Sequence, residues 1–117
     1  MSENYIRQTI IYGQYFWDFY NAQTKEVQGK IDWVIGLVRT LRVIPVKFFK
    51  HLEGTDGLYE MLIKVGSDIF RVFCCFDRGN IVILLNGFQK KSEKTLRQEI
   101  ERAEQLKQQY HESKKTK

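Results

Sequence analysis

Proline, cysteine and histidine are scarce in this sequence, and their scarcity excludes several classes of protein. It contains one proline, two cysteines and two histidines in 117 residues, and no repeat or low-complexity stretch interrupts it. No uninterrupted apolar run approaches the roughly 20 residues that a membrane-spanning helix needs. Cys74 and Cys75 are adjacent, so they form no ordinary disulfide with each other, and no nearby histidine suggests a zinc site. These features exclude a disulfide-stapled or collagen-like chain and predict a cytoplasmic protein without a membrane segment.

The composition that remains suits a small globular domain with a basic surface. Of its residues 43% are hydrophobic and 28% are charged, which is enough for one hydrophobic core and unlike a disordered chain. We predict a single domain over residues 1–117. The net charge is +5, and nine basic against five acidic residues lie between Lys90 and the end of the chain. The expected partner is therefore acidic: a nucleic acid, an anionic membrane surface or an acidic protein.

Hydrophobic spacing predicts both strands and helices. β-branched and aromatic residues dominate the strand-like runs, whereas the apolar residues before Pro45 recur with helical spacing. Asn21 or Thr24 is placed to cap that helix, and Ser92 or Thr95 to cap the last one. The expected elements are strands at 5–12, 58–65, 69–76 and 81–85, a helical turn at 15–20, helices at 25–42 and 92–110, and a frayed tail at 111–117.

These elements follow one another in the order β-α-α-β-β-β-α. Three consecutive strands favour an antiparallel meander, and the first strand is expected to join an edge of the same sheet. The predicted fold class is α+β, a small antiparallel β-sheet with the helices packed on one face. Strand 81–85 is apolar throughout, as expected of a central strand that is covered on both sides.

Alternation along the second and third strands separates a helix-facing side from an open side. If their apolar residues face the helices, then Glu60, Lys64 and Arg71 project from the opposite, open face. The segment after the last strand adds lysines and Phe88, an expected exposed aromatic. Cations neutralise phosphates and aromatic rings stack on bases, so this face suits an RNA backbone. The same residues are also consistent with surface ion pairs and solvated lysines.

Several blocks in the second half of the chain resemble a known family. They are GLYEMLIK at 57–64, FRVF at 70–73, ILLNGFQKK at 83–91, KT at 94–95, and EI followed by alanine at 99–103. In order and spacing these blocks resemble the phage-derived, HigB-like branch of the RelE/ParE toxin superfamily. The resemblance covers about half of the chain and implies a RelE-like fold.

The resemblance implies that the chain is the toxin of a type II toxin–antitoxin system. Members with RelE-like activity bind the ribosome and cut mRNA without a metal or other cofactor. The ribose 2′-OH attacks the adjacent phosphate and leaves a 2′,3′-cyclic phosphate. Arg71 matches the arginine of the family's sheet and is assigned to the charge that develops on phosphorus. The other residues assigned to catalysis are Lys64, Lys90, Lys91 and Glu60. Glu60 is the candidate general base; the alternative is that it orients Lys64 or Arg71.

The resemblance also bears on RNA binding, and the chain departs from it in two places. Leu62 stands where the branch commonly has arginine, so one cation is missing. Asn86 stands where histidine is frequent, so one acid–base group is missing. The residues expected to bind RNA are Phe88, by stacking on a base, Gln89, Lys94 and Lys47.

The partners and the alternative follow from the same resemblance. Toxins of this branch are neutralised by an antitoxin, usually a helix-turn-helix, HigA-like protein encoded alongside. The expected partners are this antitoxin, mRNA and the ribosome. The alternative is a protein of the same fold that is no nuclease: a ParE-like inhibitor of DNA gyrase, or a degenerate toxin that acts as a binding module.

Overall fold

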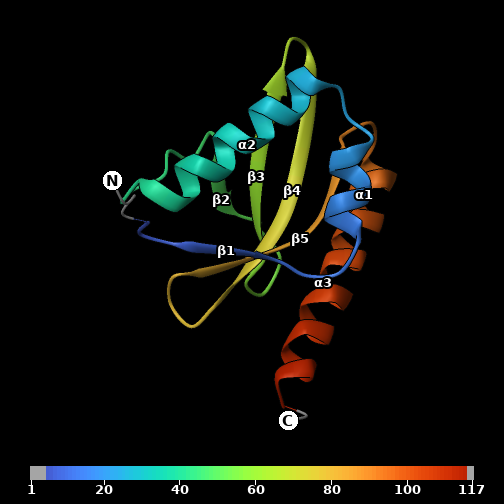
Figure 1. The fold of residues 1–117 in the computed structure, drawn as a ribbon. Helices are drawn as coiled ribbons and strands as arrows, with labels where there is room; N and C mark the ends of the chain where they lie inside the picture. Colours follow the sequence, from blue (N-terminus) through green and yellow to red (C-terminus); the bar gives the residue numbers. More distant parts are fainter. Residues whose placement is uncertain (1–4, 116–117) are drawn as a thin grey trace.

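The fold is a five-stranded β-sheet with helices on both faces (Figure 1). The computed structural model describes residues 5–115. Its elements are β1 (Gln8–Ile11), α1 (Tyr15–Asn21), α2 (Lys25–Thr40), β2 (Phe49–His51), β3 (Tyr59–Val65), β4 (Asp68–Asp77), β5 (Ile81–Gln89) and α3 (Glu93–Lys115). The strands lie in the order β1-β5-β4-β3-β2; β1 and β5 are parallel, and the other pairs are antiparallel.

The predicted α+β class and the predicted succession of the main elements are confirmed, with three differences in detail. The sheet is mixed, because β2 to β5 alternate in direction whereas β1 pairs with β5 in parallel. Residues 49–51, which lie outside the expected strands and helices, form the edge strand β2. Residues 111–115 of the predicted frayed tail are helical, because Lys114 Nζ donates to the Asp77 carboxylate at 3.0 Å. Residues 116–117 lie outside the described part of the chain.

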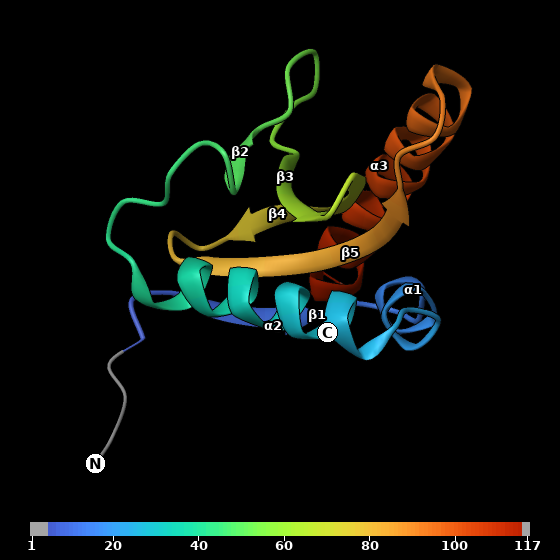
Figure 2. The same ribbon diagram turned by 90° about the horizontal axis from the view of Figure 1, so that it is seen from above.

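The prediction that all helices pack on one face is wrong, because the sheet carries an apolar layer on each side. α1 and α2 cover one face and α3 covers the other (Figure 2). The apolar residues that require α3 are Phe73 and Cys75 in β4 and Ile83 and Leu85 in β5. β5 is therefore buried on both sides, as predicted from its unbroken apolar sequence.

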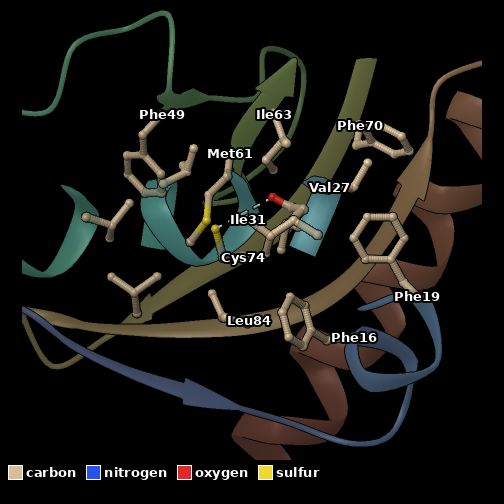
Figure 3. Packing of buried hydrophobic residues seen from close by; sticks show 14 residues of the cluster. Phe16, Phe19, Val27, Ile31, Phe49, Met61, Ile63, Phe70, Cys74 and Leu84 are labelled. Atoms are coloured by element: carbon tan, nitrogen blue, oxygen red, sulfur yellow. Dashed lines mark hydrogen bonds between the residues drawn. The ribbon is translucent and has the colours of Figure 1, made fainter. Parts of the chain in front are cut away.

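The face beneath α1 and α2 is a purely apolar core (Figure 3). Of the two residues suggested as caps, Thr24 begins α2, and its hydroxyl accepts from the Val27 backbone N–H at 3.2 Å. α1 lies so close to β5 that a Cβ on Gly87 would stand 2.3 Å from Phe19 Cδ2, so this position requires glycine. The buried residues of this core are Phe16, Phe19, Val27, Ile31, Val34, Val38, Phe49, Met61, Ile63, Phe70, Val72, Cys74, Val82 and Leu84.

α3 packs on the opposite face and is tied to the sheet by a polar contact near its end. It begins after Ser92, whose hydroxyl accepts from the Thr95 backbone N–H at 3.1 Å. The Tyr110 hydroxyl donates to the Asp77 carboxylate at 2.5 Å. Burial, together with this bond, raises the pKa of Tyr110 to about 12. The buried residues that α3 places on the sheet are Ala103, Leu106 and Tyr110.

The adjacent cysteines are ordinary strand residues, as their sequence context predicts. Cys74 and Cys75 are free and buried, and they belong to the cores on opposite faces because successive strand residues point in opposite directions. Burial raises the pKa of the Cys74 thiol well above its usual value and that of Cys75 to about 11. Neither thiol is therefore a reactive thiolate at neutral pH.

Candidate functional site

On the α3 side of the sheet, side chains form rows that run across β3, β4 and β5. The strand register puts one row together from Leu62, Arg71 and Phe88. The next row, towards the β3–β4 turn, consists of Lys64, Ile69 and Lys90, the last placed by its backbone N–H, which donates to the Ile69 oxygen at 3.0 Å. Neighbouring strands are about 4.8 Å apart, so the Cα atoms of the two lysines are about 10 Å apart, with Arg71 between them in the adjacent row.

Arg71 is held on this face by an ion pair with Glu60. Its Nη1 donates to Glu60 Oε1 at 2.7 Å. The Arg71 side chain is 15% exposed, whereas that of Glu60 is only 3% exposed. The prediction that Glu60 projects into solvent is therefore wrong, because its carboxylate is buried as the partner of the guanidinium. A general base must reach the hydroxyl that it deprotonates, and this buried carboxylate is poorly placed to do so.

A β-bulge in β5 brings Asn86 onto the same face. The register between β4 and β5 shifts at Phe73/Cys74, which makes Leu85 an extra residue and turns both Leu85 and Asn86 towards α3. The Asn86 side chain donates from Nδ2 to the backbone oxygen and to Oε1 of Glu99, at 3.1 and 2.9 Å. This contact fastens α3 beside the arginine, and the sequence analysis missed it because a bulge leaves no local signal.

Two buried polar atoms on this face have no partner among residues 5–115. They are Arg71 Nε, a donor, and Asn86 Oδ1, an acceptor on a residue that is 1% exposed. Leaving a buried polar atom unpaired costs about 1–3 kcal/mol of stability. Unpaired groups of this kind call for an explanation, and a binding or catalytic role is one.

Two of the residues predicted to bind RNA lie elsewhere than expected. β5 continues to Gln89, so Phe88 lies within the strand and is buried. Its ring packs edge-on against Phe73 with 5.2 Å between the centroids. The prediction of an exposed aromatic at Phe88 is wrong. Gln89 faces the α1/α2 side, and its Nε2 donates to Asp68 Oδ1 at 3.3 Å.

The predicted lysines form two exposed groups. Lys90, Lys91 and Lys94 lie where β5 passes into α3. Lys47 lies at the β3 edge of the sheet, where it lines a hollow of about 240 Å³ together with Lys64. Lys64 therefore belongs both to the sheet face and to its edge.

The exposed end of this face is positively charged. Glu60 is engaged by Arg71, and within the described residues neither Lys64 nor Lys90 has a carboxylate partner. Cations that are not neutralised by a neighbouring carboxylate attract phosphate groups, and an arginine with one free edge is suited to contact them. The arrangement is therefore able to bind a phosphodiester and to stabilise added charge on it.

Neither a metal site nor a membrane-spanning helix is seen in the part of the chain that the structure describes. Between residues 5 and 115, no three His, Cys, Asp or Glu side chains gather in a way that would hold a metal ion. None of the helices in that range combines the length and the apolar character needed to cross a bilayer.

Comparison with known families places the chain among phage-derived proteins. Residues 18–108 match the family described as Phage derived protein Gp49-like (DUF891). The match runs from α1 into α3 and includes Arg71, Lys64 and the lysines after β5. Comparison with curated proteins gives no match.

Proposed function

We propose that this chain, which belongs to the Gp49-like family of phage-derived proteins, is the toxin of a type II toxin–antitoxin system and cuts mRNA on the ribosome. The family is RelE-like and toxin-like, which supports a toxin neutralised by a cognate antitoxin. Its HigB-like character, a helix-turn-helix antitoxin, a cytoplasmic location and a single toxin domain over residues 1–117 are parts of the same proposal.

The observation that carries the proposal is the grouping of cations at one end of the sheet. Lys64 in β3, Arg71 in β4 and Lys90 directly after β5 share one face. The carboxylate that pairs with Arg71, that of Glu60, is almost fully buried, so it does not stand between the guanidinium and solvent. A phosphodiester placed over Arg71 would therefore meet positive charge on three sides.

In the proposed reaction, the ribose 2′-OH gives its proton to a solvent water molecule as its oxygen forms a bond to phosphorus, and the bond from phosphorus to the 5′-oxygen breaks. The products are a 2′,3′-cyclic phosphate and a 5′-OH. Arg71 keeps Nη1 on Glu60 and offers Nη2 to the phosphate oxygens, where negative charge accumulates in the transition state. The ammonium of Lys64 or Lys90 gives a proton to the departing 5′-oxygen. Lys91 and Lys94 hold phosphates farther along the RNA.

We assign Glu60 as a positioning residue in place of the predicted general base. Its ion pair fixes the guanidinium against the sheet, so that the free edge of Arg71 has one orientation before RNA arrives. Groups that are already oriented stabilise a transition state without reorganising at the moment of reaction. Phe88 and Phe73 support the same surface from below.

The test is induction of the protein in growing bacteria, with mapping of mRNA 5′ ends after a few minutes. The parent should stop growth and create new mRNA ends that carry a 5′-OH. Arg71→Lys keeps a cation beside Glu60 but loses the second donor edge, so cleavage should fall at least about 100-fold. Arg78→Lys is the matched control, because Arg78 lies about 23 Å away beyond the other end of β4; it should behave like the parent.

Two outcomes would contradict the proposal. Growth arrest with intact mRNA and accumulating DNA breaks would indicate a ParE-like gyrase inhibitor. Induction without any effect on growth, from a chain shown to be folded, would indicate a degenerate toxin that acts only as a binding module. The missing cation at Leu62 and the missing acid–base group at Asn86 make both outcomes worth measuring.

A further inference from the structure

An opening lies at the edge of the sheet where β2 stops. β2 pairs only with residues 59–61 of β3, so within the described chain the edge from Ile63 to Val65 has no strand beside it. Two hollows lie along this edge: one of about 490 Å³ between α2 and the end of β3, and one of about 240 Å³ that the segment before β2 also lines. The cationic and aromatic side chains that line these hollows, here called the β3-edge patch, are Lys30, Trp33, Lys47, Phe48 and Lys64; Glu26, Leu62 and Val65 also line them.

Aromatic rings hold two of these lysines in place. Lys30 Nζ lies 4.6 Å from the Trp33 ring centroid and 6.0 Å from that of Phe48. Lys47 Nζ lies 5.1 Å from the Phe48 centroid. The two rings meet edge to face, with 5.3 Å between their centroids. The ammonium groups are therefore positioned by ring faces, which attract cations without neutralising their charge.

The patch is ready to take an anion. Among residues 5–115, Lys30, Lys47 and Lys64 form no ion pair with a carboxylate. Glu26 lines the larger hollow but makes no salt bridge to these lysines. An incoming phosphate would thus break no salt bridge. Trp33 is 49% exposed, so part of its ring surface remains available for a second contact.

We propose that the β3-edge patch binds single-stranded RNA, with the lysines on its phosphates and Trp33 against a base. Unpaired cations interleaved with an exposed aromatic are the combination that single-stranded nucleic acids require, because bases stack while the backbone is neutralised. An acidic protein segment would satisfy the lysines but would leave the exposed ring of Trp33 without a matched contact. RNA uses both kinds of group.

The inference deepens the proposed function, on which it rests. Lys64 lines the hollows of the patch and also stands in the row beside Arg71. An RNA strand that crosses Arg71 would therefore continue over Lys64 and across the β3 edge towards α2. In this arrangement the patch holds nucleotides next to the one that is cut, and Lys64 is the point where the two surfaces join.

The test measures binding of a labelled 12-nucleotide oligouridine to the full-length protein across a salt series. Each phosphate contact in a single strand contributes about 0.7 to the slope of log affinity against log salt, so Lys30→Gln/Lys47→Gln should lower that slope by about 1.4. Trp33→Ala should weaken binding about tenfold at every salt concentration and leave the slope unchanged. Thermal unfolding checks that each variant is folded.

The matched control is Arg78→Gln/Lys115→Gln, which removes two exposed charges outside the patch and should keep the parental slope. A slope unchanged in Lys30→Gln/Lys47→Gln overturns the inference. The inference is also overturned if binding of a polyglutamate peptide depends on these lysines and binding of RNA does not. An acidic protein would then be the occupant of the patch. If Lys30→Gln/Lys47→Gln lowers the slope but the parent leaves cellular mRNA uncut, the RNA-binding surface is supported and the proposed nuclease is not. If the parent cuts mRNA but the slope does not change in this variant, the nuclease is supported and the surface is not.

Discussion

The two faces of the sheet are built for different purposes. Beneath α1 and α2 every buried residue is apolar, and glycine at 87 allows close packing; the one buried polar side-chain atom without a hydrogen bond there, within the described chain, is Nε of the partly exposed Arg39. Beneath α3 the layer is apolar only in part; it also contains Glu60 and Asn86, the two buried polar residues of the described chain, and the half-buried Arg71. Buried polar groups stabilise less than packed hydrocarbon, so the second face gives up stability where the first does not. The difference indicates where a function other than folding has been placed.

Replacing the ion pair by apolar residues should separate function from stability most sharply. In Glu60→Leu/Arg71→Met we expect mRNA cleavage to fall at least about 100-fold, because the group that stabilises charge on phosphorus is gone. Its free energy of unfolding should stay within about 1 kcal/mol of the parent, whereas Arg71→Ala alone should lose about 3 kcal/mol by leaving Glu60 buried without a partner. Reporter mRNA cleavage in a translation extract and urea unfolding measure the two quantities. A double variant that still cuts mRNA would remove Arg71 from the mechanism.

On the other face, truncation should affect stability alone. Ile31 is fully buried, so Ile31→Ala should lower the free energy of unfolding by about 3 kcal/mol. Cleavage per folded molecule should not change, since Ile31 lies on the far side of the sheet from Arg71. Lys25→Ala, an exposed position on the same helix, is the control and should shift stability by less than about 0.5 kcal/mol. A loss of activity beyond the loss of folded protein would show that the two faces are coupled.

Gly87→Ala should sharpen the contrast in packing between the faces. The new Cβ would meet the Phe19 ring at 2.3 Å, and we expect a loss of about 2 kcal/mol in urea unfolding. Gly36 in α2 has open space around its added Cβ, so Gly36→Ala should instead stabilise the protein by about 0.5 kcal/mol. Adding Phe19→Leu to Gly87→Ala should recover part of the loss; no recovery would mean that Phe19 is not the obstacle.

The smallest effect concerns the bond that ties α3 to β4. Tyr110→Phe removes the hydroxyl that donates to Asp77 and should cost about 1 kcal/mol. Hydrogen bonds from Tyr110 and Lys114 lower the pKa of Asp77 below its usual 3.8, so this stabilisation is present above about pH 4 and is lost as the pH falls through the lowered pKa. The Tyr110 pKa of about 12 preserves the bond up to alkaline pH.

Unfolding of the parent and of Tyr110→Phe from pH 2 to 9 measures this linkage. The difference between them should be constant from about pH 5 to 9 and should shrink at lower pH. Asp77→Asn should abolish the dependence on the tyrosine. A difference that grows on acidification would show that another group controls the contact.

The sequence was informative where strands alternate without interruption. It placed Met61 and Val72 under helices, and Arg71 with Lys64 on the other face, because each strand keeps a period of two residues. It also carried a signal that was missed: Phe73 and Cys75 put apolar side chains on the face predicted to be open, which required a cover.

What the sequence did not reveal depends on tertiary contacts. The bulge at Leu85 changes the phase of β5 and turns Asn86 towards Glu99, and no local pattern marks such an insertion. The burial of Glu60 follows from its pairing with Arg71 across two strands. The β3-edge patch joins residues from α2 and from the segment before β2, whose proximity depends on how the sheet ends.

The parallel pairing of β1 with β5 has a consequence for how the chain is made. Gln8 pairs with Ile81, which is 73 positions later. At about 5–20 residues per second, a ribosome needs about 4–15 s to synthesise the intervening segment. During that interval α1 has no β5 to pack on, whereas α2 can pack on β3 once the β3–β4 turn has closed, and the meander forms through short turns as it emerges. β1 and α1, although made early, thus reach their final contacts only after β5, and until then their apolar residues are exposed to aggregation and to proteases.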